Sequence, residues 1–117
     1  MILDYGVGVP VDETEAARYY KMSADNGNVS SMFFYSLKLK NGEGVPVDYE
    51  EAVHYLKMGV DSDDPKCLNN YGACLLIGTG VPINKVEAAR YFKMAADKGL
   101  IFGMMNYARM VFYGDEI

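Results

Sequence analysis

The feature that most constrains the fold is a glycine- and proline-containing segment that occurs three times at a fixed spacing. The segments at residues 6–10, 42–46 and 78–82 read GVGVP, GEGVP and GTGVP, so they lie 36 residues apart. A period of this length is typical of solenoids, in which each repeat buries its apolar face only against its neighbours. Gly114 stands one further period along. We expect a single array of about three repeats over residues 1–117, cut within a repeat at both ends, as a fragment of a longer chain.

Each segment is followed by a signal for the start of a helix. Asp12, Asp48 and Asn84 are N-cap residues with a glutamate three positions later, a capping-box arrangement that satisfies free amide donors. Apolar residues then recur at helical spacing, with charged residues on the opposite side. We refer to these helices as the B helices and expect them to end near residues 27, 63 and 99. Glycine favours the left-handed C-cap, so we expect a looser turn at Asp63.

A second helix of each repeat, the A helix, is expected at residues 28–41, 64–77 and 100–113. Each has one stripe at helical spacing that we expect to pack inward. The stripes are Ser31, Met32, Tyr35, Ser36 and Leu39; Cys67, Leu68, Tyr71, Gly72 and Leu75; and Gly103, Met104, Tyr107, Ala108 and Val111. The predicted fold class is all-α: a right-handed α-α superhelix of helix-turn-helix repeats, with about six helices of roughly 12 to 15 residues and no strand.

Composition and charge narrow the function classes. Half of the residues are hydrophobic and 23% are charged, which is ordinary for a folded soluble domain. The formal net charge of -5 repels phosphate backbones, so no nucleic acid partner is expected. No apolar run approaches the roughly 18 to 20 residues of a membrane span. The N-terminus has no signal-peptide pattern, and Cys67 and Cys74 are expected to stay reduced, so we expect a cytoplasmic protein.

These residues resemble the Sel-one-like repeat (SLR) family, relatives of the tetratricopeptide (TPR) repeats, over essentially the whole chain. The match is closest from Cys67 to Gly99. It includes the small residue at Cys67, Gly72, the Gly-x-Gly-Val loop, the helix cap and the Ala-Ala pair of the family pattern. Some packing positions differ, such as Tyr71 where leucine is usual. The resemblance implies an α-solenoid that acts as an adaptor between proteins. Some secreted relatives carry paired cysteines; here Cys67 lies near one such position, but Val60 stands at the other, which disfavours that branch.

The sequence offers no catalytic, cofactor or metal site. The repeated Gly-x-Gly lacks the strand and glycine-rich turn of a phosphate-binding loop. His54 is the only histidine, and its counterparts Arg18 and Arg90 mark it as a surface cation position. The carboxylates are spread over caps and the outer face, so none is paired for acid-base catalysis. We therefore expect no enzyme and no cofactor.

A partner is expected on the side of the A helices opposite the inward stripes, which lines a concave groove in the related repeats. We name this side the A-helix face. Its candidate residues are Phe33, Leu37, Lys40, Lys66, Asn69, Asn70, Ala73, Leu76, Met105, Asn106, Arg109 and Phe112. Apolar side chains with amide and cationic neighbours suit peptide recognition, and the cations could orient an acidic segment of the partner. The alternative is that several of them fill gaps between neighbouring A helices, and the sequence leaves both readings open.

Two function classes remain at this point. The first is a protein-protein interaction scaffold that binds a protein or peptide segment of unknown identity. The second is a regulatory repeat segment of a multidomain enzyme, such as a protein kinase, whose catalytic domain lies elsewhere.

The last helix contains several apolar residues: Phe102, Met104, Met105, Met110 and Phe112. We therefore also expect self-association through exposed terminal repeats.

Overall fold

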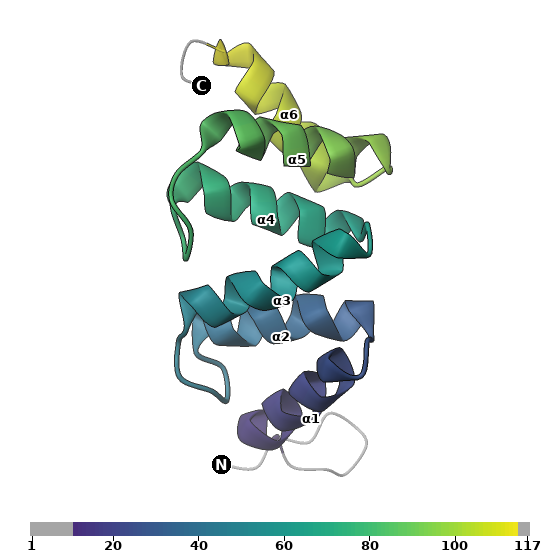
Figure 1. The fold of residues 1–117 in the computed structure, drawn as a ribbon, viewed down its shortest axis with the longest axis vertical. Helices are drawn as coiled ribbons and strands as arrows, with labels where there is room; N and C mark the ends of the chain where they lie inside the picture. The colour runs from purple at the N-terminus through teal and green to yellow at the C-terminus, as the bar shows by residue number, and fades with distance from the viewer. Residues whose placement is uncertain (1–10, 115–117) are drawn as a thin grey trace.

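The computed structural model describes residues 11–114, and six α-helices account for most of them (Figure 1). Their bounds are α1 Glu13–Asp25, α2 Val29–Asn41, α3 Tyr49–Asp61, α4 Pro65–Ile77, α5 Lys85–Asp97 and α6 Ile101–Phe112. The odd-numbered helices are the predicted B helices and the even-numbered ones are the A helices. No strand occurs within residues 11–114. The predicted fold class is therefore confirmed: the chain is an all-α solenoid of helical repeats.

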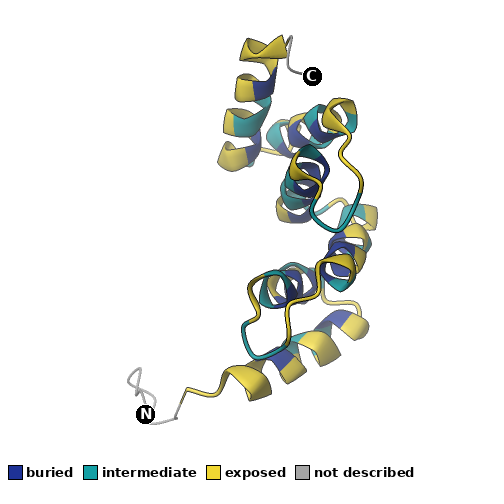
Figure 2. Cartoon of the chain, turned by 90° about the vertical axis from the view of Figure 1, so that its left-hand side faces the viewer, coloured by how far each residue is buried: buried dark blue, intermediate teal, exposed yellow. Residues whose placement is uncertain are grey.

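The helices stack in chain order. Each packs mainly against the helix before it and the helix after it, and α4 also touches α6. The stack measures 51 × 28 × 27 Å and curves into an arc when seen from the side (Figure 2). The elongated shape follows from the repeat, because each unit finds its apolar partner only in its neighbours.

The predicted caps determine where the helices begin. The side chains of Asp12, Asp48 and Asn84 each accept a hydrogen bond from the backbone N–H three residues later, at 3.0 to 3.1 Å. Among the A helices, Asn28 and Asp64 cap α2 and α4 in the same way. These bonds satisfy amide donors that would otherwise have no partner at a helix N-terminus.

The turn from each B helix to the next A helix is the same in all three repeats. Asp63 adopts φ 61°, close to the left-handed values of 94° at Gly27 and 93° at Gly99. The following N–H bonds back to the helix at 3.0 Å for Asp64 and 3.1 Å for Leu100. The predicted looser turn at Asp63 is wrong, because aspartate tolerates the left-handed region better than most side chains.

The core runs the length of the stack in two clusters joined by α3. Ala52 and Tyr55 of α3 belong to the N-terminal cluster, and Val53 and Leu56 belong to the C-terminal one. The inward stripes predicted for α2 and α4 are buried at every position. These stripes account for much of the buried apolar surface, which is the main stabilising contribution to such a fold.

The stripe predicted for α6 is wrong at three of its positions. Gly103 is buried and Tyr107 is half-buried, but Met104, Ala108 and Val111 are exposed. On α2 and α4 the equivalent residues are covered by the following B helix, and no described helix follows α6. Met110, which we expected to be exposed, is buried in the C-terminal cluster instead. It lies 36 residues after Cys74, which is also buried in that cluster.

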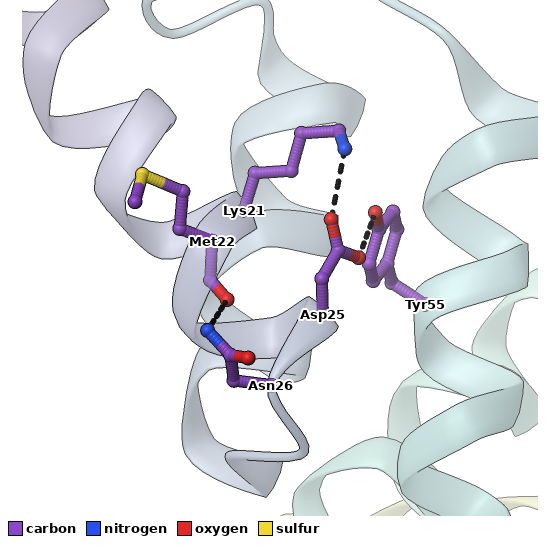
Figure 3. A network of polar contacts seen from close by, with 5 residues as sticks. All are labelled: Lys21, Met22, Asp25, Asn26 and Tyr55. Atoms are coloured by element: carbon purple, nitrogen blue, oxygen red, sulfur yellow. Dashed lines mark hydrogen bonds and ion pairs between the residues drawn. The ribbon is translucent and has the colours of Figure 1, made fainter.

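Tyrosine pairs connect α2 to α3 and α4 to α5. The rings of Tyr35 and Tyr55 meet edge to face at 4.9 Å, and Tyr71 and Tyr91 repeat that contact at the same distance. At the first junction the Tyr55 hydroxyl also donates to Asp25 of α1 at 2.7 Å (Figure 3). Burial and this hydrogen bond raise the pKa of Tyr55 to about 12. Two successive B helices are thus joined by a polar contact as well as by packing.

Small residues allow each B helix to cross the next A helix closely. The facing pairs, eight residues apart in sequence, are Ser23 and Ser31, Gly59 and Cys67, and Ala95 and Gly103. The Ser31 hydroxyl donates to the Ser23 hydroxyl at 2.7 Å. A Cβ added at Gly59 would overlap the Cys67 sulfur, and one added at Gly103 would lie 2.9 Å from the Ala95 Cβ. Each crossing therefore holds a pair whose combined size suits the gap.

Candidate partner-binding face

Side-chain contacts connect α2 with α4 and α4 with α6 along one surface of the stack. Between α2 and α4, the Lys66 ammonium lies 5.7 Å from the centre of the Phe33 ring. Between α4 and α6, the Asn106 side-chain amide donates to the Asn69 side-chain oxygen at 2.9 Å. All four residues belong to the predicted A-helix face. Side chains from three separate repeats therefore form one continuous surface.

Most residues of this face are partly exposed, and none of the twelve is fully buried. Lys66, Met105, Arg109 and Phe112 are exposed, and the other eight are half-buried. Phe33, Ala73 and Leu76 pack against the C-terminal core cluster. The packing role that the sequence left open therefore applies in part to these three residues, while their outer surfaces remain accessible.

A small pocket lies between α2 and α4. Leu37 and Lys40 of α2 and Asn70 of α4 line it, so the structure brings these predicted residues together. Cys74 also lines this pocket. Burial raises the pKa of its thiol, and the nearby Lys40 ammonium partly opposes that shift. Met105, Arg109 and Phe112 stand apart on α6, where the Phe112 ring packs against Tyr113 at 4.8 Å.

Three residues of this region were not among the predicted ones. Tyr49 and Thr79 also line the pocket, from the start of α3 and the loop after α4. Tyr49 stands at the start of a helix and Thr79 lies in a loop, so helical periodicity predicted neither of them. Phe34 is exposed, with its ring 5.4 Å from that of Phe33. It stands 36 residues before Asn70, so the repeat itself contained the signal for Phe34.

The outer face of the B helices carries paired surface charges. Arg18 and Arg90 bond to the glutamates three residues earlier, at 3.0 and 2.6 Å. His54 is exposed between them in the repeat order, as predicted for a surface cation position. No cluster of three or more histidine, cysteine or carboxylate side chains suited to a metal occurs within residues 11–114. The helices described are too short and too polar for any of them to cross a membrane.

Comparison with known proteins agrees with this arrangement. A family model described as the Sel1 repeat matches residues 1–28, 29–64 and 65–100. None of the curated protein sequences compared with the chain matches it. Among solved structures, a protective antigen present in uropathogenic Escherichia coli strains, with an SLR fold, is 26% identical to the chain with a TM-score of 0.88. That match covers 93% of this chain and 23% of the antigen.

Two further structures share the fold at lower identity. A Sel1 repeat protein from Oxalobacter formigenes is 23% identical with a TM-score of 0.81, over 87% of this chain and 30% of that protein. Cysteine rich protein B from Helicobacter pylori is 19% identical with a TM-score of 0.74, over 80% of this chain and 71% of that protein. The chain thus spans less than a third of the length of the first two structures.

Proposed function

Because the chain belongs to the Sel1 repeat family, we propose that it is a scaffold that binds a peptide or protein segment on its A-helix face, with no catalysis of its own. Proteins with Sel1 repeats generally serve as scaffolds for protein interactions. The observation that carries the choice of face is its continuity across three repeats, through the contacts of Phe33 with Lys66 and of Asn69 with Asn106.

The composition of the face supports peptide binding. Half-buried apolar groups such as Leu37 and Leu76 can remove apolar side chains of a peptide from water, while Asn70 and Asn106 can bond to its backbone. A face built on three packed helices is also held in place before binding, which reduces the entropy lost on association.

Selection of peptides from a displayed random library on the purified chain tests this proposal. We expect enriched peptides whose affinity, measured by calorimetry, falls about tenfold when Lys66, Met105 and Arg109 are replaced together by alanine. These three side chains are exposed, so helicity and unfolding should change little. Phe33→Ala is a poorer test because it also removes contacts with the core.

The matched control is Lys85→Ala, at an exposed position in the first turn of a B helix. This variant should bind the selected peptides like the unmodified chain. Unchanged affinity in the triple variant, or loss of affinity only after changes on the B helices, would show that the binding face has been assigned wrongly.

Self-association is a second part of the proposal, supported by the apolar surface of α6. Met104 is 46% exposed and Val111 is 58% exposed. Lysine at both positions should shift a concentration-dependent oligomer towards monomer in sedimentation experiments, because a charge opposes burial of this surface. Met110 is unsuitable for that test because it is buried. A chain that is monomeric at high concentration before any substitution contradicts this part.

A cytoplasmic location is the third part, supported by the two thiols. Cys67 and Cys74 are free and buried, and burial raises the pKa of both. We expect neither to react quickly in the folded protein, because the thiolate is the reactive form. Titration of the denatured protein without reductant should then count both thiols. A count of zero would contradict a reducing compartment.

A further inference from the structure

Charge is divided unequally between the two kinds of helix. The A helices α2, α4 and α6 contain Lys38, Lys40, Lys66 and Arg109 and no aspartate or glutamate. Each B helix carries both signs, and four ion pairs form within α1 and α5. The whole chain has a formal net charge of -5. The A helices of this acidic protein therefore carry only positive charges within their bounds.

Three of these four cations have no carboxylate partner among residues 11–114. Lys38 pairs with Glu43 at 3.6 Å, whereas no ion pair there includes Lys40, Lys66 or Arg109. These three are the cations of the A-helix face, one on each A helix. Lys66 lies over the Phe33 ring, and Lys40 shares a pocket with Asn70. Each A helix thus offers one positive charge that is not part of an ion pair among the described residues.

We propose that the A-helix face binds an acidic peptide segment, whose carboxylates contact Lys40, Lys66 and Arg109 while apolar side chains between them contact Phe33, Leu37 and Met105. This inference rests on the proposed function and adds the chemistry of the partner. Unpaired cations favour anionic ligands, and charge complementarity of this kind sets specificity and speeds association. Among the B helices, α1 and α3 carry more carboxylates than lysines and arginines, so they attract the same ligand less.

The three cations lie at different levels along their helices. Lys40 lies in the last turn of α2 and Arg109 in the last turn of α6, whereas Lys66 is the second residue of α4. A bound segment must therefore run along the A helices as well as across them to reach all three. A peptide is favoured over nucleic acid because three separated cations on a protein of net negative charge neutralise few phosphates.

Fluorescence anisotropy with three labelled probes tests the inference. The probes are a peptide of alternating glutamate and leucine about eight residues long, the same peptide with glutamine in place of glutamate, and single-stranded oligothymidine. At low salt the glutamate peptide should bind about tenfold more tightly than the glutamine peptide, and added salt should reduce the difference. Oligothymidine should bind more weakly than the glutamate peptide.

Two matched variants locate the effect. Lys66→Glu and Lys85→Glu change the net charge equally, and both lie in the first turn of a helix. Lys66→Glu should weaken binding of the glutamate peptide about tenfold or more, whereas Lys85→Glu should change it little. Circular dichroism should show the same helicity in both variants.

Each contrary outcome has a distinct meaning. Equal affinity for the glutamate and glutamine peptides, or no binding of the glutamate peptide, overturns the acidic-peptide inference. Equal weakening by the two variants shows a net-charge effect and also overturns it. The proposed function survives all three results if the peptides selected from the random library still depend on Lys66, Met105 and Arg109. Tighter binding of oligothymidine indicates a nucleic acid ligand instead.

Discussion

Replacing Gly80 by alanine is expected to lower the free energy of unfolding by roughly 3 to 4 kcal/mol, the sum of backbone strain and overpacking. Gly80 has φ 73°, in the left-handed region that a Cβ disfavours. A Cβ there would also lie 2.5 Å from the Tyr49 carbonyl oxygen and 2.9 Å from its carbon. These are backbone atoms of the previous B helix, so relief requires the loop to move away from its neighbour.

The close approach recurs in the repeat. Gly44, one period earlier, has φ 81° and lies directly against the backbone of Glu13 at the start of α1. The second glycine of each described Gly-x-Gly-Val-Pro segment therefore holds a loop against the preceding repeat. We interpret this contact as part of what determines how successive repeats stack.

Gly99→Ala is the matched control for Gly80→Ala. Gly99 has φ 93° but no atom within 4 Å of an added Cβ, so this variant contains the backbone strain without the clash. It should cost about 1 to 2 kcal/mol. Urea unfolding followed by circular dichroism measures both variants. Equal destabilisation by the two substitutions would show that the contact with Tyr49 contributes nothing.

The second large effect is expected at the crossing of α3 and α4. Gly59→Ala should lower the free energy of unfolding by about 1 to 2 kcal/mol, because the added methyl group overlaps the Cys67 sulfur. This loss outweighs the higher helix propensity of alanine. Cys67→Gly should cost about 2 to 3 kcal/mol through lost burial and helix propensity. The loss in the free energy of unfolding of the double variant should be about 2 kcal/mol smaller than the sum of the two single losses.

The reason for this coupling lies in the third repeat. Ala95 and Gly103 occupy the equivalent crossing of α5 and α6, so the double variant places at α3 and α4 a pair that the chain already uses. Gly59→Ala with Cys67→Ser is a useful comparison, because serine keeps a side-chain atom in the place of the sulfur. Unfolding measurements that give simple additivity would show that the two sites do not share the space between the helices.

The helix pattern was predictable because its signals are local. A cap such as Asp48 acts on an N–H three residues away, and helical periodicity acts within one element. The repeat then predicted the order in which helices pack, since each unit lacks another partner. The stripes on α2 and α4 were correct for the same reason: both helices have a B helix on either side.

The errors occurred where a residue depends on what packs against it. Met104 and Val111 repeat the pattern of buried positions but are exposed, because no described helix covers them. Met110 is buried through contacts with the C-terminal cluster. Asp63 was expected to loosen a turn, but the bonds around it hold the same geometry as at Gly99.

The sequence by itself determined the number, approximate bounds and order of the helices, and the family. Only the tertiary structure decided which residues of the A-helix face contact one another, as Phe33 does with Lys66 and Asn69 with Asn106. It also decided that Lys40, Lys66 and Arg109 have no carboxylate partner in the described chain. The physical reason is range: caps, periodicity and most ion pairs act within about one turn or one helix, whereas burial and the contacts between A helices depend on residues about one repeat away.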